Sequence, residues 1–206
     1  MKPLREKRYE QKRIEILKSA ASAFRKKGFH GTSMDEISDR LLMTKGSLYY
    51  YFKNKEELLY ACHDYSLNRL LLTLEEIEKN GISVEDRLRN LIVSHVKHLI
   101  DELHASAMTI ELDGLSPLLR ERIIRKRDRY ERGFRKLIQE GMEKGVFKKG
   151  DPKLITFAIL GALNWISKWF SPEGSVRSER IGEVFSNFFV KGLFNDHLAT
   201  LMKEKR

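Results

Sequence analysis

The stretch that decides the fold is "MTKGSLYYYFKNKEEL", residues 43–58. Three tyrosines and a phenylalanine follow a run of small and basic residues, and three lysines lie within the same stretch. A buried core accommodates rings but excludes lysines, whereas a solvated face accommodates lysines but seldom so many rings. The pattern therefore predicts a segment that packs on one side and meets an anionic partner on the other.

Cap and stop signals divide the surrounding sequence into helices. A glycine at position 28 ends the first helix, which is predicted over about 8–27. Ser33, with Glu36 three residues later, forms a capping box that opens a short second helix, and a third is expected over 44–51. Two short helices joined by a tight turn and packed on a longer one predict a helix-turn-helix unit, whose second short helix enters the DNA major groove.

The third helix carries residue types that suit contact with DNA. Small and basic residues at its start let the backbone approach and donate to phosphates or base edges. Leu48 and Phe52, four residues apart, face inward, whereas the tyrosines between them leave the helix on other sides. The predicted DNA-contacting residues are Thr32, Ser33, Thr44, Lys45, Gly46, Ser47, Tyr49, Tyr51, Lys53 and Lys55. The alternative is an aromatic-rich helix pair with solvated lysines.

The placement of charge agrees with an anionic partner. The formal net charge is +10, and residues 1–57 hold 14 Lys and Arg against 8 Asp and Glu. The other 149 residues hold 25 against 21, so the first quarter of the chain is disproportionately basic. A basic segment attracts polyanions by releasing their counterions, although a charged, solvated surface is the alternative. We expect double-stranded DNA as a partner.

Several classes of protein are not expected. No apolar run approaches the ~18 residues that span a bilayer, and the first residues lack the apolar core of a signal peptide, so we expect no membrane partner and a cytoplasmic location. Cys62 is the only cysteine, so no internal disulfide can form. His95 and His98, with Glu102 a turn later, are weak evidence of a metal site, and we expect no metal and no cofactor. The sequence has no nucleophile elbow and no phosphate-cradling glycine loop, so no enzymatic activity is expected.

The rest of the chain is also predicted to be helical. Cap, proline and glycine signals predict helices over about 55–79, 84–104, 117–144 and 152–170, with a shorter one ending before Asp113. The last helix is expected to start at Ser175 or Ser178 and to end near residue 193. The segments 154–170 and 181–194 are apolar around most of their circumference, which suits a four-helix interface across a two-fold axis. The predicted dimer-interface residues are Phe157, Leu160, Val184, Phe185 and Phe188. The alternative is an unusually large monomer core.

Residues 28–61, "GFHGTSMDEISDRLLMTKGSLYYYFKNKEELLYA", resemble the DNA-binding domain of the TetR family of repressors. The resemblance implies an all-α protein with an N-terminal three-helix helix-turn-helix DNA-binding domain, residues 1–54, and a C-terminal helical ligand-binding and dimerisation domain, residues 55–206. It also implies a homodimeric repressor that binds a palindromic operator and is released by a small apolar effector. Leu42 stands where the family usually has glycine, and a non-glycine residue at positive φ costs roughly 1 kcal/mol or more.

The segments 116–141 and 161–174 resemble the sensor domain of the branch of that family that responds to acyl-coenzyme A thioesters. Residues 120–136 hold nine Arg and Lys against three acids, and the phosphates of coenzyme A need cations. The predicted ligand-binding residues are Met108, Arg122, Arg125, Lys126, Arg129, Tyr130, Phe134, Trp165 and Trp169.

Alternatives stay open for each part of that prediction. The arginines also fit a solvated helix face laced with ion pairs four residues apart. The two tryptophans also fit a core or an interface. The effector could be a drug-like or other hydrophobic molecule, and the chain could be a helical acyl-CoA-binding protein or an enzyme that does not bind DNA.

Overall fold

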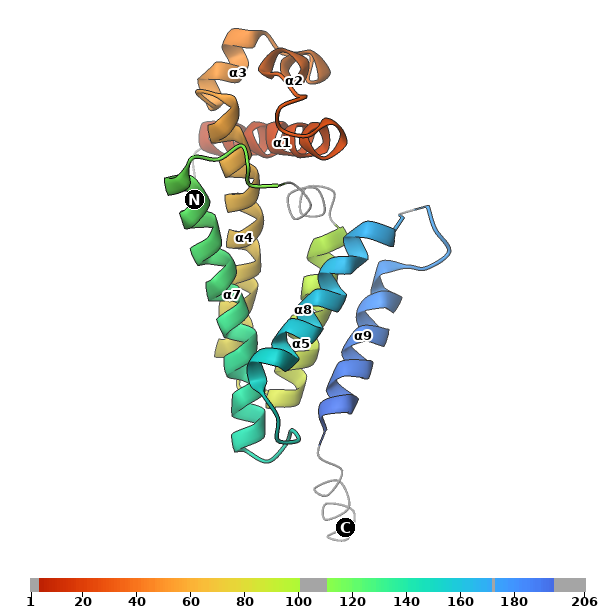
Figure 1. The fold of residues 1–206 in the computed structure, drawn as a ribbon. Helices are drawn as coiled ribbons and strands as arrows, with labels where there is room; N and C mark the ends of the chain where they lie inside the picture. Colours follow the sequence, from red (N-terminus) through yellow and green to blue (C-terminus); the bar gives the residue numbers. More distant parts are fainter. Residues whose placement is uncertain (1–3, 101–110, 172, 195–206) are drawn as a thin grey trace. The chain divides into compact units, whose positions relative to one another are not determined.

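A computed structural model describes residues 4–100, 111–171 and 173–194. Within these ranges the chain is all-α, as predicted, and has no β-strand beyond an isolated bridge between Phe147 and Phe194. The helices are α1 (Leu4–Lys27), α2 (Met34–Arg40), α3 (Lys45–Tyr51), α4 (Lys55–Lys79), α5 (Val84–Ile100), α7 (Pro117–Glu143), α8 (Pro152–Trp169) and α9 (Ser178–Leu193) (Figure 1). The shorter helix expected before Asp113, and the last residues of the helix expected over 84–104, fall on residues outside the described ranges.

Side-chain caps explain where several helices begin. Ser33, Thr44, Asn54 and Asp151 each accept a hydrogen bond from a backbone N–H two or three residues later, at 2.7 to 3.3 Å. These bonds satisfy donors that the first turn of a helix leaves unpaired. The cap signals in the sequence therefore predicted the helix starts closely, whereas the uncapped α1 starts at Leu4 rather than near residue 8.

The described chain divides into two compact units. The head comprises residues 4–68 and 111–125, and the body comprises residues 69–100, 126–171 and 173–194. Helices α4 and α7 each contribute residues to both units. The first part of α4 therefore packs with the three N-terminal helices, although the sequence placed a domain boundary at its start.

In the head, α1 packs with α2 and α3 around one apolar cluster (Figure 1). Phe24 of α1, Ile37 of α2 and Leu48 of α3 are fully buried, together with Phe52 directly after α3. The inward orientation predicted for Leu48 and Phe52 is confirmed. Because α3 has a single buried side chain, much of its surface is not used for packing in the core of the head.

The turn between α2 and α3 contains the one departure from the family pattern. Leu42 has a φ of 51°, and it is 97% exposed. The turn therefore keeps the left-handed conformation that favours glycine, and the leucine side chain gains no packing in return. A residue with a Cβ in this conformation costs about 1–2 kcal/mol.

The body is built around α5, which contacts both α8 and α9 (Figure 1). Its buried residues Leu91, Ile92 and Val96 form a core with buried aliphatic residues of α8 and α9. Glycine allows a close approach of α7 to α4, because a Cβ at Gly133 would lie 2.2 Å from Cδ2 of Leu74.

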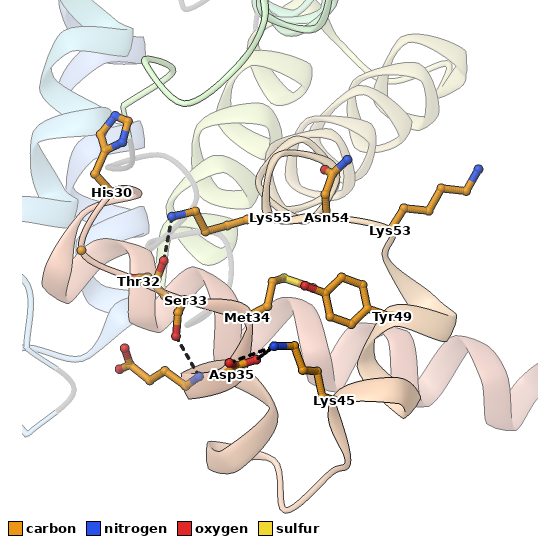
Figure 2. A pocket seen from close by; sticks show the side chains of 12 residues that line it. His30, Thr32, Ser33, Met34, Asp35, Lys45, Tyr49, Lys53, Asn54 and Lys55 are labelled. Atoms are coloured by element: carbon orange, nitrogen blue, oxygen red, sulfur yellow. Dashed lines mark hydrogen bonds and ion pairs between the residues drawn. The ribbon is translucent and has the colours of Figure 1, made fainter.

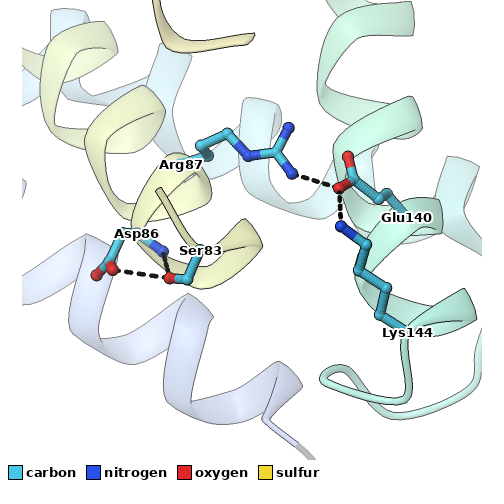
Figure 3. Close-up of polar contacts among 5 residues, drawn as sticks. All are labelled: Ser83, Asp86, Arg87, Glu140 and Lys144. Carbon is cyan, nitrogen blue, oxygen red and sulfur yellow. Dashed lines mark hydrogen bonds and ion pairs between the residues drawn. The ribbon is translucent and has the colours of Figure 1, made fainter. Parts of the chain in front are cut away.

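A partly buried ion pair joins α5 to α7 (Figure 3). Arg87 donates to a carboxylate oxygen of Glu140, which also accepts from Lys144 at 2.7 Å. The bond from Arg87, and then the bond from Lys144, hold the pKa of Glu140 below its usual value.

At the start of α5, the Ser83 hydroxyl accepts from the backbone N–H of Asp86 at 3.0 Å and donates to its carboxylate at 2.7 Å.

Candidate nucleic-acid interface

Helix α3 presents an exposed polar face. Lys45, Gly46, Ser47 and Tyr49 are all exposed, whereas Leu48 is fully buried. No atom lies within 4 Å of the place that a Cβ would take at Gly46. Packing inside the chain therefore does not require glycine there, and the missing side chain leaves the backbone accessible to a partner.

An open hollow of about 530 Å³ lies beside α3 (Figure 2). It is lined by the start of α2, by α3 and by the start of α4. Six of the ten predicted DNA-contacting residues line it: Thr32, Ser33, Lys45, Tyr49, Lys53 and Lys55. The N-terminus of the 25-residue helix α4 adds its partial positive charge to the lysines, so the hollow suits a phosphate.

Lys45 is held across the hollow by Asp35 of α2 (Figure 2). Its ammonium lies 2.8 and 3.0 Å from the two carboxylate oxygens, and the hydrogen bond that it donates to Asp35 raises the pKa of Lys45. Both side chains are largely exposed, and exposed ion pairs contribute about 0–1 kcal/mol. The pair therefore orients Lys45 at a small cost in free energy, so another anionic group can take the place of Asp35.

Lys55 has a different environment from the one predicted. Its ammonium donates to the backbone oxygens of Phe29 at 2.8 Å and Thr32 at 2.7 Å, and it lies 4.4 Å from the centre of the Phe29 ring. These contacts use the ammonium to fix the loop between α1 and α2. Lys53, by contrast, is exposed and extends away from that loop (Figure 2).

Two other predicted DNA contacts are occupied within the head. Thr32 is 2% exposed, and its hydroxyl donates to the backbone oxygen of Gly28 at 2.9 Å. The Tyr51 ring stacks on Tyr9 of α1, with the ring centroids 4.9 Å apart. Both side chains have structural roles in this arrangement. Tyr50 is not among the predicted contacts, but it is more exposed than Tyr49. Its position four residues after Gly46, on the same side of the helix, could have identified it.

The segment before α7 also packs on the head. Glu56 of α4 accepts a hydrogen bond from the backbone N–H of Ser116 at 2.7 Å, which lowers the pKa of this carboxyl. A Cβ at Gly114 would lie 2.4 Å from the ring of Phe29. The loop between α1 and α2 is thus held by α4 through Lys55 and packs closely against Gly114, whereas Ser116 bonds to α4.

Most of the cations predicted to bind an effector lie on a solvated surface. Arg125 and Arg129 are largely exposed, and they pair with Glu121 at 3.3 Å and Glu75 at 2.6 Å. Arg122 is exposed as well. These environments favour the alternative of a solvated helix face with ion pairs. Met108 lies outside the described residues.

Two predicted ligand residues of α7, Tyr130 and Phe134, are buried in the body. The Tyr130 hydroxyl lies 3.0 Å from Nδ1 of His95, and Nε2 of His95 lies 3.2 Å from Oδ1 of Asn164. Burial lowers the pKa of His95 to about 4, so the ring is neutral near pH 7. With Asn164 as acceptor, Nε2 carries the proton and Nδ1 accepts from Tyr130. Among the described residues no cluster of His, Cys, Asp and Glu is suited to a metal ion.

Helices α8 and α9 each expose a row of large apolar side chains. On α8 the row includes Phe157, Trp165 and Trp169, and Trp165 is 64% exposed. On α9 it includes Val184 and Phe188, and Phe188 is 73% exposed. Leu160 and Phe185 are half-buried beside them. Exposed rows of large apolar side chains are candidates for an interaction site. No helix in the described part of the chain has the length and apolarity needed to cross a membrane.

Comparison with known families gives matches to both parts of the chain. Residues 16–62 match the family described as bacterial regulatory proteins, tetR family. Residues 81–193 match the family described as the tetracyclin repressor-like C-terminal domain, and this match alone covers more than half of the chain.

Individual relatives are similar over nearly the full length. The chain is 26% identical over 191 residues to the HTH-type transcriptional repressor KstR2 of Rhodococcus jostii, covering 90% of this chain and 93% of the relative. It is similar to the structure of the TetR family transcriptional regulator PfmR from Thermus thermophilus, with a TM-score of 0.79 and 31% identity over 87% of this chain and 99% of that one. It is also similar to AibR in complex with isovaleryl coenzyme A and operator DNA, with a TM-score of 0.75 and 26% identity over 85% of this chain and 96% of that one.

Proposed function

Since this chain belongs to the TetR family of bacterial transcriptional regulators, we propose that it is a homodimeric repressor whose palindromic operator is released when an acyl-coenzyme A binds. The observation that carries the proposal is the exposed face of α3, where Lys45, Ser47 and Tyr49 surround a glycine that internal packing does not require. In this assignment α3 enters the major groove.

The contacts within the head support separate roles for the residues that would contact DNA and the residues that would support them. Lys45, Ser47 and Tyr49 on α3 are placed to meet base edges or the adjoining backbone, and Thr44 caps the helix. Lys53 and the N-terminus of α4 then bind a phosphate at the hollow. Lys55 and Thr32 contribute indirectly, because they hold in place the loop that forms the wall of the hollow.

The exposed apolar rows of α8 and α9 support the homodimer. Two copies of these rows, related by a two-fold axis, would cover Phe157 and Phe188 in a four-helix interface. A two-fold dimer presents two copies of α3, which requires half-sites about 34–36 Å apart or a multiple of that spacing. The operator should then be palindromic.

An acyl-coenzyme A is proposed as the effector because a structural relative, AibR, is solved with isovaleryl coenzyme A and operator DNA. The buried, neutral side chains of His95 and Tyr130 place polar groups inside the apolar core of the body, and His95 also bonds to the exposed Asn164. For a full switch the ligand must bind the arrangement that cannot bind DNA more tightly than the one that can. A change in the ratio of the two arrangements from 1:99 to 99:1 requires a difference in binding free energy of ~5.5 kcal/mol.

Fluorescence anisotropy tests this proposal on a labelled duplex that carries the palindrome upstream of the protein's own gene. We expect salt-dependent binding, two chains per duplex, and release by micromolar palmitoyl-CoA or isovaleryl-CoA but not by the free acids. A duplex with one scrambled half-site is the control and should bind more weakly. Equal affinity for both duplexes would contradict the palindromic dimer, and release by acid and thioester at equal concentration would contradict the thioester effector.

A further inference from the structure

Three side chains of α7 form a partly buried ionic row in the body. Arg127, Glu131 and Arg135 follow one another at four-residue spacing, so they share one face of the helix. The Glu131 side chain is only 15% exposed, and its carboxylate accepts a hydrogen bond from Arg135. Within the described residues, Nε of Arg127, Oε1 of Glu131 and Nε of Arg135 are buried without a hydrogen-bond partner.

The row contains one more positive charge than negative charge. Because Glu131 pairs with Arg135, the surplus charge belongs to Arg127. Nε of Arg127 is buried and has no hydrogen-bond partner among the described residues, and burial lowers the pKa of its guanidinium. Arginine nevertheless stays charged near neutral pH. Proteins rarely leave such a group unpaired unless it serves a function, because removing a charge from water costs several kcal/mol.

The side chains next to Arg127 are apolar or neutral. Ile123, one turn before it, is fully buried, and Tyr130 and Phe134 follow it by three and seven residues on the same side of the helix. Tyr130 belongs to the neutral cluster with His95, so no anionic group comes from that direction. The arrangement is a guanidinium fork next to an apolar wall.

We propose that Arg127 anchors the effector by binding an oxyanion that is attached to an apolar group. The planar guanidinium binds a carboxylate or a phosphate through two parallel hydrogen bonds, a geometry that lysine cannot reproduce. The inference rests on the proposed function, because it names the chemistry of the effector of that same regulator. It replaces the exposed, paired Arg125 and Arg129 with one half-buried cation as the main anchor.

The test compares Arg127→Met with Arg132→Met in the full-length protein. Both variants remove one charge from α7, but Arg132 is exposed and serves as the matched control. Thermal unfolding is followed without ligand and with palmitate, palmitoyl-CoA, isovaleryl-CoA or the uncharged methyl palmitate. We expect Arg127→Met to unfold without ligand at an unchanged or higher temperature than wild type, because it removes an unpaired charge from a buried place.

The ligand arms identify the oxyanion. We expect Arg127→Met to bind the anionic ligands roughly 10- to 100-fold more weakly than wild type and Arg132→Met, which corresponds to the loss of hydrogen bonds to a charged group. A loss confined to palmitate indicates a carboxylate as the anchored group, and a loss confined to the thioesters indicates a phosphate; either result supports the anchor.

Four results would overturn the anchor. They are a lower unfolding temperature for Arg127→Met without ligand, unchanged binding of the anionic ligands, wild-type binding of methyl palmitate as tight as that of the anions, and no response of the wild type to any anionic probe. Operator binding is measured on the same samples. Intact operator binding with a failed ligand arm refutes the anchor alone, whereas absent operator binding refutes the proposed regulator.

Discussion

Helices α3 and α7 are both basic or flanked by basic residues, but they use their cations in opposite ways. Around α3, Lys45 and Lys53 are exposed on the surface of the head, next to a hollow. On α7, the exposed Arg125 and Arg129 are engaged in ion pairs, whereas Nε of the half-buried Arg127 has no hydrogen-bond partner among the described residues.

The difference follows from what each helix must recognise. A DNA surface is met from outside, so the residues that bind it must be exposed, and their order along a short helix shows in the sequence. A small effector is enclosed, so the residues that bind it are selected by packing, which sequence spacing alone does not specify. The comparison predicts that surface changes affect the head's DNA binding, while interior and interface changes affect the body.

The largest effect is expected in the rows of exposed apolar side chains on α8 and α9 of the body. Phe188→Asp places a charge in the proposed dimer interface, where an unpaired buried charge costs about 3–5 kcal/mol. We expect a monomer by light scattering and a roughly 100-fold or greater loss of operator affinity. Leu118→Asp, which alters another exposed apolar residue, should remain dimeric. A dimeric Phe188→Asp variant would show that the exposed row of α9 is ordinary surface.

The interior of the body should respond to acid through His95. Its pKa is about 4 in the folded chain, below the ordinary value of 6.5, because the ring is buried, with His98 adding a smaller repulsion. The unfolded chain binds the proton more readily, so stability is complete above pH 6.5 and falls as the pH drops toward 4, by about 3 kcal/mol. Urea unfolding at several pH values measures this loss. The stability of His95→Gln should depend much less on pH, whereas that of His30→Gln, which alters an exposed histidine, should depend on pH as wild type does. Equal pH profiles for wild type and both variants would contradict a buried neutral ring.

Lys55 and Lys53 sharpen the comparison within the head itself. Lys55 donates to two backbone oxygens, so Lys55→Met should lower the free energy of unfolding by roughly 1–3 kcal/mol. Lys53→Met should leave stability within about 0.5 kcal/mol of wild type and weaken DNA binding, since its side chain is exposed. Chemical denaturation of both variants measures the difference. If Lys55→Met were as stable as wild type while its salt dependence changed, Lys55 would be a phosphate contact after all.

The turn at Leu42 should give the smallest effect. Leu42→Gly removes the strain of a Cβ at positive φ, partly offset by the entropy of glycine, and should raise the free energy of unfolding by roughly 0.5–1 kcal/mol. Leu42→Ala keeps the Cβ and is the matched control, with little change expected because the leucine side chain is exposed. Thermal unfolding distinguishes the two. A destabilised glycine variant would mean that the leucine side chain contributes more than its exposure suggests.

The fold could be predicted from the sequence because its signals are local. Caps such as Ser33 and Asn54 act on the next backbone donors, and the spacing of Leu48 and Phe52 determines which side of α3 packs. The candidate DNA interface rests on the same kind of local signal and stays a prediction. The sequence did not reveal the intramolecular contacts of Lys55 and Thr32, because their partners lie in a loop distant along the chain or in the backbone, which residue type alone does not indicate.

The site in the body was harder to predict. The nine cations of residues 120–136 look alike in the sequence, and only tertiary packing separates the exposed Arg125 from the half-buried Arg127. Asn164 was missed because its partner, His95, lies on another helix 69 residues away. The exposed position of Trp165 and Trp169 depends likewise on how α8 packs against α5.

The most direct test of the central claim, that α3 reads DNA, is the ratio of operator affinity to affinity for a scrambled duplex, measured by anisotropy across a salt series. Lys45→Ala should lower operator affinity by about 1–3 kcal/mol and reduce the ratio. Lys53→Ala should weaken both duplexes equally and reduce the salt slope by about one, as loss of a single phosphate contact does. Unchanged ratios and salt slopes in both variants would contradict the assignment of α3 and its hollow as the DNA-binding surface.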